Sequence, residues 1–315
     1  MQEYNKNLQR VMVEIKKVII GKDSIIEKVL MAILAGGHVL IEDIPGVGKT
    51  TLALAISKVL QLDYRRMQFT PDVLPGDVVG FQMLTADGKM QYRPGSIMCN
   101  LFLADEINRT SSKTQSALLE VMEEGNVTVD GVTRPLPTPF VVIATQNPIG
   151  SVGTQMLPES QMDRFMVRLT MGYPDIASEI GMLKDREEGN PLDRVENVLG
   201  KKELLQIQEA VENTYIHDAV YSYIAALVQK TRENDMLALG VSPRGTIALA
   251  NMAKAAAYMA GRDYVIPDDV RKVFGDVVKH RMLLAPKARL NRTTMDDVAA
   301  GILSAVSAPR LHKKA

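Results

Sequence analysis

The segment IEDIPGVGKT, residues 41–50, brings together the residue types that bind a phosphate group. Such a site needs backbone N–H groups that approach the anion closely, a helix N-terminus and one lysine. The segment supplies these features at Gly46, Gly48, Lys49 and Thr50. Asp43 stands where phosphate-binding loops have their first glycine, but it precedes the cradle, and aspartate tolerates a positive φ. We therefore interpret the segment as a nucleotide phosphate loop, against the alternative of a chance glycine-rich turn.

A second segment, LFLADE at 101–106, is an apolar run that ends in two acids. Asp105 is suited to hold Mg²⁺ through water beside Thr50, and Glu106 is suited to polarise an attacking water. The alternative is a strand that merely meets solvent in two acids. The phosphate loop one strand–helix unit earlier favours the chemical interpretation.

Alternating strand and helix patterns must position these two segments. Helical spacing covers residues 24–35 and 50–60, and apolar runs typical of buried strands occupy 38–41, 101–106 and 140–147, with weaker candidates at 64–70 and 166–170. The alternation predicts an α/β fold, in which a parallel sheet has helices on both faces. Ligands of such sheets bind at the carboxyl ends of the strands, where the polar residues of both segments fall.

The remaining patterns indicate two hairpins and a second domain. Asp-Gly pairs at 87–88 and 130–131 lie between strand-like flanks and predict β-hairpins. After Pro174 the strand patterns stop, and helical patterns follow at 176–188, 201–212, 217–234, 243–260, 267–280 and 294–306. We expect an α/β core at 1–174 and an all-helical domain at 175–315, because Pro174 blocks continuation of either element.

The composition is that of a globular chain of 315 residues, 46% of them hydrophobic, with 37 basic and 37 acidic side chains. This balance does not favour nucleic acid or an anionic membrane as a partner. Charges throughout the first 30 residues leave no room for a secretory signal, and no apolar run reaches the roughly 20 residues of a membrane span. We expect a cytoplasmic protein with Cys99, the single cysteine, in its core, and no metal cluster among its scattered histidines.

The motifs DIPGVGKT, LADEINRT, ATQNP, LPESQMDRF and GVSPRGTIALA, in this order, resemble those of the MoxR family of AAA+ ATPases. The resemblance extends over nearly the whole chain, and an acidic residue at the Asp43 position is familiar in that family. It implies an αβα nucleotide-binding core with a parallel sheet and two inserted β-hairpins, followed by a helical lid domain. It also implies ATP and Mg²⁺ as cofactors and assembly into a ring, usually a hexamer.

The resemblance gives roles to individual residues. It makes the loop a Walker A motif, with Lys49 on the β- and γ-phosphates, in a cradle of Pro45, Gly46, Val47, Gly48, Lys49, Thr50 and Thr51. It makes LADE a Walker B motif, with Thr50 and Asp105 as magnesium residues and Glu106 as the catalytic base. Asn147 matches sensor 1, which orients the attacking water; the alternative is a strand-end asparagine that caps a turn before Pro148.

Arginines complete the implied site. Arg164 in MDRF matches the arginine finger, which offers a planar, permanent charge to the γ-phosphate of a neighbouring subunit. The alternatives are an internal ion pair of Arg164 with Asp163 or Glu159, and Arg168 as the finger. Arg109 is a further candidate contact to a neighbouring subunit, with surface solvation as its alternative.

Arg244 and the segment before the first helix complete the nucleotide contacts that the resemblance implies. Arg244 follows Ser242 and Pro243, an N-cap and first-turn signature. It matches sensor 2, which reaches the phosphates when the lid closes. Adenine recognition falls to the segment VIIGKD, where the candidates are Val18, Ile20 and Gly21.

These roles lead us to expect an ATP-hydrolysing, chaperone-like remodelling ATPase that acts on a protein client. The resemblance implies maturation of enzyme complexes or cofactor insertion, often with a partner that carries a von Willebrand factor A domain. One alternative is a nucleotide-gated regulatory module with negligible hydrolysis, against which Glu106, Asn147 and Arg164 argue. A less favoured one is a nucleic-acid motor, supported only by Lys89 and Arg93. On the same hairpin, Met83 and Met90 are candidates to touch a client, although methionines more often pack in cores.

Overall fold

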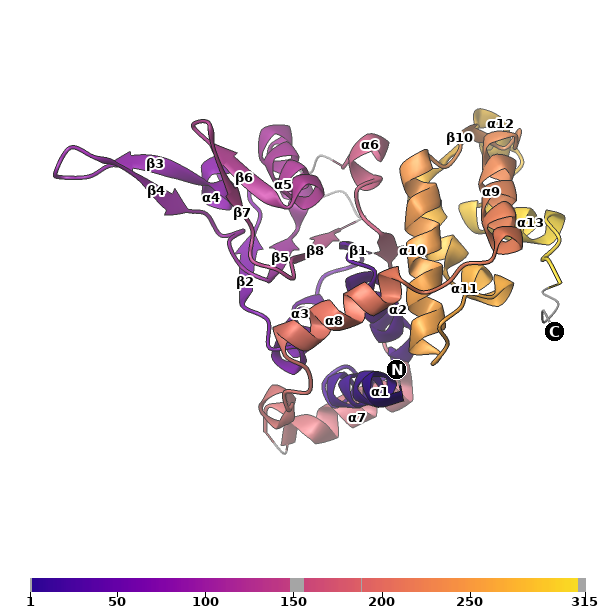
Figure 1. The fold of residues 1–315 in the computed structure, drawn as a ribbon, viewed down its shortest axis with the longest axis horizontal. Helices are drawn as coiled ribbons and strands as arrows, with labels where there is room; N and C mark the ends of the chain where they lie inside the picture. Colours follow the sequence, from indigo (N-terminus) through magenta and orange to yellow (C-terminus); the bar gives the residue numbers. More distant parts are fainter. Residues whose placement is uncertain (1, 148–155, 188, 311–315) are drawn as a thin grey trace.

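A five-stranded parallel sheet forms the centre of the N-terminal part of the chain (Figure 1). The computed structural model describes residues 2–147, 156–187 and 189–310. The strands lie in the order β2-β5-β8-β1-β9, and each pairs in parallel with its neighbours. Their bounds are Val39–Glu42 for β1, Tyr64–Gln68 for β2, Leu101–Asp105 for β5, Val141–Gln146 for β8 and Val167–Leu169 for β9. The predicted α/β class and all five predicted strands are confirmed.

Helices cover both faces of this sheet because its central strands are apolar on both sides. Every residue of β5 and β8 is buried. Leu103 and Ile143 belong to one core, with α1 (Gln2–Lys16), α2 (Asp23–Leu34) and α3 (Lys49–Val59). Phe102 and Val142, one position away, belong to a second core with α5 (Ser112–Glu124). Because side chains alternate across a strand, the result is a three-layer αβα arrangement.

Two β-hairpins extend away from the central sheet (Figure 1). The first pairs β3 (Gly80–Leu84) with β4 (Met90–Pro94) and follows the short helix α4 (Pro75–Val79); the second pairs β6 (Asn126–Val129) with β7 (Val132–Pro135). Asp130 and Gly131 both have positive φ, at 50° and 76°. Aspartate followed by glycine suits such a turn, which two-residue hairpins require. Both predicted hairpins are confirmed.

The C-terminal part is a bundle of helices with one small sheet. Its main helices are α7 (Ile176–Glu187), α8 (Lys201–Glu212), α9 (Asp218–Arg232), α10 (Pro243–Met259), α11 (Pro267–Val278) and α13 (Met295–Ala305), which confirm the six predicted helical segments. A shorter helix, α12, spans Pro286–Leu290. The prediction that strands end at Pro174 is wrong, because β10 (Leu237–Leu239) pairs antiparallel with β11 (Leu283–Leu284). These two strands are too short to show a periodic pattern.

The two parts share a continuous hydrophobic core. Buried side chains of α2, such as Leu30 and Ile33, belong to the same cluster as Leu249 and Met252 of α10. Helix α1 also joins this cluster and is missing from the predicted helices, because its buried apolar residues form a narrow stripe among polar ones: Leu8, Val11 and Ile15. The domain boundary at residue 174 remains a prediction, and the shared core opposes free movement of the helical part as a separate body.

The described residues also bear on three questions: membrane-spanning helices, metal sites and the place of the single cysteine. None of the helices in the described ranges has the length and apolar character needed to cross a bilayer. Across the same ranges, no three His, Cys, Asp or Glu side chains gather as a metal site. Cys99 lies in the second core, as predicted, and burial raises the pKa of its thiol to about 12.

His38, which precedes β1, is buried in its neutral form. Its Nε2 donates to the Met122 carbonyl oxygen at 2.9 Å, and its Nδ1 accepts from the Val142 N–H at 3.0 Å. A second proton on Nδ1 would face that N–H, and burial lowers the pKa of His38 to about 4. The folded protein therefore binds this proton less readily than the unfolded chain does, where the pKa of histidine is about 6.5.

We predict that the stability contributed by His38 is fully present above about pH 6.5 and declines as the pH falls towards 4, by about 3 kcal/mol in total. Urea unfolding at several pH values, for the wild type and for His38→Gln, measures this difference. The comparison cancels the acid sensitivity of His280, another buried histidine with a lowered pKa. Parallel pH profiles of the two proteins would contradict the assignment.

Candidate nucleotide-binding and hydrolysis site

The glycine-rich loop lies between the carboxyl end of β1 and the first turn of α3. Gly46 and Gly48 have φ values of 87° and 95°, in the left-handed region that favours glycine. Helix α3 begins at Lys49, so Thr50 and Thr51 occupy its first turn. Backbone N–H groups without helical partners therefore surround the loop at the positive end of the helix dipole, which is the arrangement that binds phosphate.

Asp43 fixes the start of this loop. Its side chain is buried, and its two oxygens accept from the Ile44 N–H at 2.8 Å and from the Gly172 N–H at 2.6 Å. The second bond joins the loop to the chain just after β9. Asp43 does not have a positive φ, so the tolerance of aspartate for that conformation plays no part. A glycine at this position would leave the N–H groups of Ile44 and Gly172 without this acceptor. The two hydrogen bonds therefore explain why an acid occupies the position.

Lys49 extends back along the loop. Its Nζ donates to the backbone oxygen of Asp43 at 2.7 Å. Burial lowers the pKa of Lys49, while the charges of Asp43, Asp105 and Glu106 oppose that shift. The three carboxylates thus favour the ammonium form that a phosphate ligand requires.

The two acids lie at the carboxyl end of β5, at the same edge of the sheet as the loop: Asp105 ends the strand and Glu106 follows it. Asp105 accepts from the Thr145 hydroxyl at Oδ1 (2.6 Å) and from Arg66 Nη2 at Oδ2 (2.6 Å). Glu106 has a φ of 56°, an uncommon conformation for a residue with a side chain, and its N–H donates to the same Thr145 hydroxyl at 2.9 Å. Thr145, on the neighbouring strand β8, therefore positions both acids.

The donor set suits Mg²⁺. Carboxylate and hydroxyl oxygens are the ligands that this ion prefers, and Asp105 at the end of β5 and Thr50 in the first turn of α3 provide them. In this structure the Arg66 guanidinium pairs with Asp105 Oδ2, so it would have to release that oxygen before the carboxylate could hold a metal ion through it. Residues Thr50 and Asp105 would hold the metal beside the bound phosphates.

Glu106 is held by two neighbours. Its Oε2 accepts from Arg109 Nη1 at 2.7 Å and from Gln68 Nε2 at 2.9 Å. Gln68 lies on β2, in register with Asp105. Arg109, a candidate contact to a neighbouring subunit, is thus engaged within its own chain in this structure. The contributions of Arg66 and Gln68 went unpredicted because they depend on the register of two strands far apart in sequence.

Asn147 follows β8 and lies at the same edge as the loop and the acids. Its backbone oxygen accepts from Asn108 Nδ2 at 3.2 Å. The placement agrees with a residue that orients water near Glu106, which remains a prediction. The alternative, a cap on a turn before Pro148, involves residues outside the described ranges.

A cavity of about 510 Å³ opens beside the loop and has room for a nucleoside. Among its lining residues are Val18, Ile20 and the loop residues 45–48 and Thr51. One wall comes from α7 and the chain before it, through Met171, Tyr173, Met182 and Leu183. Gly21 does not line the cavity but supports this wall. The α7 residues went unpredicted because nothing in their local pattern distinguishes them from an ordinary surface helix.

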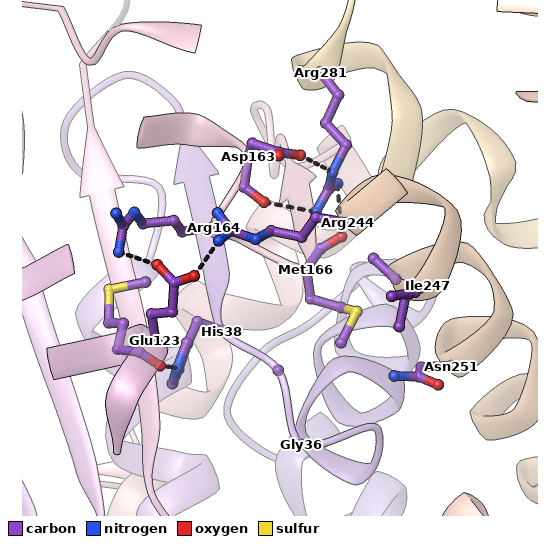
Figure 2. A pocket seen from close by; sticks show the side chains of 13 residues that line it. Gly36, His38, Glu123, Asp163, Arg164, Met166, Arg244, Ile247, Asn251 and Arg281 are labelled. Carbon is purple, nitrogen blue, oxygen red and sulfur yellow. Dashed lines mark hydrogen bonds and ion pairs between the residues drawn. The ribbon is translucent and has the colours of Figure 1, made fainter. Parts of the chain in front are cut away.

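A second group of polar residues lies at the opposite edge of the sheet, around a smaller cavity of about 210 Å³ (Figure 2). Arg164 and Arg244 both pair there with the carboxylate of Glu123 on α5, one with each of its oxygens. Arg164 therefore has an internal partner, but it is Glu123 and not Asp163 or Glu159. Arg168 pairs with Glu42 on the neighbouring strand at 2.9 Å, away from this cavity.

A buried ion pair fixes the backbone beneath these arginines. Arg281 Nε donates to Asp163 Oδ1 at 2.8 Å, and its Nη2 donates to the Phe165 oxygen at 2.6 Å. Ser242, the N-cap of α10, donates to Asp163 Oδ2 at 2.8 Å and accepts from the Gly245 N–H at 3.1 Å. Burial lowers the pKa of Arg281 to about 10, and the charge of Asp163 opposes that shift. The segment that carries Arg164 and the helix that carries Arg244 are therefore joined.

The strand β1 separates the two groups of residues. Gly37 and His38, at its amino end, line the arginine cavity, whereas Pro45 and Gly46, beyond its carboxyl end, line the nucleotide cavity. The five residue steps from His38 to Asp43, along β1, cover about 16 Å. In this arrangement Arg244 does not approach the phosphate loop of its own subunit, so the expected contact on lid closure is not made here.

The fold and the site together define a nucleotide-binding protein of the AAA+ class. A family profile described as ATPase family associated with various cellular activities (AAA) matches residues 38–167, and a profile for the AAA lid domain matches residues 229–301. The chain is 37% identical to Chaperone MoxR1 of Mycobacterium tuberculosis, over 97% of this chain and 83% of that protein. It belongs to the MoxR family of AAA+ ATPases.

Two further likenesses extend over nearly the full length. The uncharacterised protein YeaC of Bacillus subtilis is 48% identical, over 94% of this chain and 92% of its own. The crystal structure of a Cytophaga hutchinsonii protein provisionally assigned as an ATPase superposes with a TM-score of 0.91 at 35% identity, covering 98% of this chain and 97% of that one. The predicted family and fold are confirmed.

We predict that Gly21→Ala weakens nucleotide binding roughly tenfold, equivalent to about 1.4 kcal/mol. The added Cβ would stand 2.1 Å from Ser178 Oγ, so α7 must shift away from the cavity. Gly36→Ala is the matched control, because Gly36 has nearly the same φ, 70° against 72°, but open space around its Cβ position. Equal affinities of the two variants for a fluorescent ATP analogue would contradict this role of α7.

Proposed function

We propose that the protein hydrolyses Mg-ATP at sites shared between neighbouring subunits of a ring, and that the cycle remodels a protein client. The observation that supports this best is the separation of the two groups of residues. The phosphate loop and its acids lie at the carboxyl ends of the strands, and Arg164 and Arg244 lie near the amino ends. A head-to-tail ring brings one group of each subunit against the other group of the next.

Within this site each residue has a distinct task. Lys49 offsets charge on the β- and γ-phosphates, and Thr50 and Asp105 would hold Mg²⁺, which neutralises phosphate charge when bound. Glu106 takes the proton of the attacking water once Gln68 and Arg109 release its oxygen. Asn147 orients that water. Arg164 and Arg244 of the next subunit stabilise the charge that develops on the transferred phosphoryl group.

The first hairpin supplies a surface for the client. Phe81, Leu84 and Met90 are 49%, 66% and 62% exposed, and Leu84 lies directly opposite Met90 across the hairpin. The Arg134 guanidinium of the second hairpin lies 4.0 Å from the centroid of the Tyr92 ring, in the middle of β4, and this contact joins the two hairpins. Exposed apolar side chains along a braced hairpin suit an extended, partly unfolded protein segment. The name Chaperone MoxR1 of one relative agrees with such a client.

Other aspects of the function extend this proposal. We assign the client to the maturation of enzyme complexes or to cofactor insertion, with a partner that carries a von Willebrand factor A domain, and the working assembly to a hexamer in the cytoplasm. The nucleotide-gated module is the second candidate, and one observation favours it. Asp105 and Glu106 are both held in internal ion pairs with arginines, a state that must be released before hydrolysis.

We predict that Glu106→Gln binds ATP with wild-type affinity but lowers turnover at least about a hundredfold, because the amide cannot accept the proton of water. Equilibrium binding of labelled ATP and steady-state phosphate release measure the two properties separately. Wild-type turnover in this variant would favour the gated module or another base.

We predict that wild-type turnover per subunit rises with protein concentration, and that Arg164→Ala abolishes this rise by lowering turnover about a thousandfold. Arg168→Ala is the control, since Arg168 pairs with Glu42 and lies outside the arginine cavity. Phosphate release across a range of protein concentrations tests both variants. A flat profile for the wild type together with normal activity of Arg164→Ala would contradict a shared site.

A further inference from the structure

We propose that Glu123 is a positioning residue, which holds Arg164 and Arg244 as one paired anion-binding unit for the nucleotide of the next subunit. This inference rests on the proposed function. Glu123 is the last but one residue of α5, and no feature of its sequence surroundings pointed to it. Its Oε2 pairs with Arg164 Nη1 and its Oε1 with Arg244 Nη2, so a single carboxylate bridges two guanidinium groups (Figure 2).

The bridge acts on side chains whose backbones are already fixed. Arg281 holds the carbonyl oxygens on both sides of Arg164, those of Asp163 at 3.2 Å and Phe165 at 2.6 Å. Through Ser242, Asp163 also anchors the first turn of α10, two residues before Arg244. What remains free is the direction of the two long side chains. Glu123 sets that direction, and the Leu119 carbonyl oxygen adds one bond to Arg164 Nη1 at 2.9 Å.

Charge explains why such a bridge is needed. Two guanidinium groups that converge on one small cavity repel each other, and each would otherwise turn towards water. The Glu123 carboxylate between them offsets this repulsion and uses the planar geometry that guanidinium shares with carboxylate and phosphate ligands. The three side chains are 41%, 29% and 43% exposed for Glu123, Arg164 and Arg244, so the unit faces outwards where a neighbouring subunit can meet it.

The occupant of this unit is the terminal phosphate of a nucleoside triphosphate bound to the adjacent copy of the chain. In the described part of the chain, the arginine cavity and the nucleotide cavity share no lining residue. Glu123 therefore takes no part in binding the nucleotide of its own subunit. A change at Glu123 therefore affects the catalysis of the neighbour and leaves its own affinity unchanged. This division separates a positioning role from general damage to the fold.

The test combines Glu123→Ala with subunit mixing. We expect rings of Glu123→Ala alone to lose at least about tenfold in turnover at saturating ATP, with an ATP dissociation constant within about twofold of wild type. Glu120→Ala, an exposed acid one turn earlier on α5, is the matched control and keeps wild-type turnover. Wild-type or faster turnover of Glu123→Ala would overturn the proposal.

Mixing Glu123→Ala with Glu106→Gln decides whether the effect crosses the interface. Each Glu106→Gln subunit lacks turnover but presents an intact Glu123, Arg164 and Arg244 to its neighbour. At equal amounts, about one quarter of the interfaces join an intact site to an intact arginine pair, and turnover recovers to about that fraction of wild type. A mixture that shows no more than the average of its two parents would overturn the proposal.

The mixture of Arg164→Ala with Glu106→Gln separates this inference from the proposed function. Recovery in that mixture without recovery in the Glu123 mixture would leave the shared site in place and remove the role of Glu123. Absence of recovery in both would contradict the shared site itself.

Discussion

The direction of a parallel sheet is the constraint on which this structure depends. All five strands point the same way, so their carboxyl ends gather Lys49, Asp105 and Asn147 at one edge, while the amino ends lie at the other. The arginines enter at that other edge, near His38. Strands of three to six residues keep the two edges apart. In the function that we propose, a complete hydrolytic site therefore requires a second copy of the chain, which a head-to-tail ring supplies.

The helical part contributes through its attachment to the core. Helix α10 packs on α2 behind the sheet, and the Asp163, Ser242 and Arg281 network joins its first turn to the segment before β9. Arg164 and Arg244 lie 80 residues apart in the sequence, but this network connects the segments that carry them. In the proposed function, a nucleotide bound to one subunit would act on this connected unit of the next subunit.

Much of the fold was predictable because it depends on local patterns. Buried parallel strands are continuous apolar runs, the hairpins carry Asp-Gly turns, and Ser242 with Pro243 marks a helix start. Each of these elements can be recognised from a few consecutive residues. The phosphate loop and the two acids were found for the same reason. Helix α1 and the strands β10 and β11 were missed, because a narrow apolar face or two short segments give no clear period.

The rest of the site depends on contacts between distant parts of the chain. The Asp43 carboxylate accepts a hydrogen bond from the N–H of Gly172, 129 residues away in the sequence. The partners of Arg66 and Gln68 depend on the register between β2 and β5. The alternative for Arg164, an internal ion pair, was sought among its neighbours in sequence, yet its partner Glu123 lies on α5. The location of Arg244 depends on the face of the core against which α10 packs. No local sequence pattern predicts that face.

The central claim is that Arg164 and Arg244 serve the nucleotide of the next subunit. The most direct test is a structure of the Glu106→Gln ring with Mg-ATP, determined by electron cryomicroscopy at a resolution that shows side chains. The account predicts that both guanidinium groups lie within hydrogen-bond distance of a γ-phosphate held by Lys49 of the adjacent subunit. A γ-phosphate contacted by Arg244 of the same subunit that supplies Lys49, with Arg164 remote from any nucleotide, would contradict it.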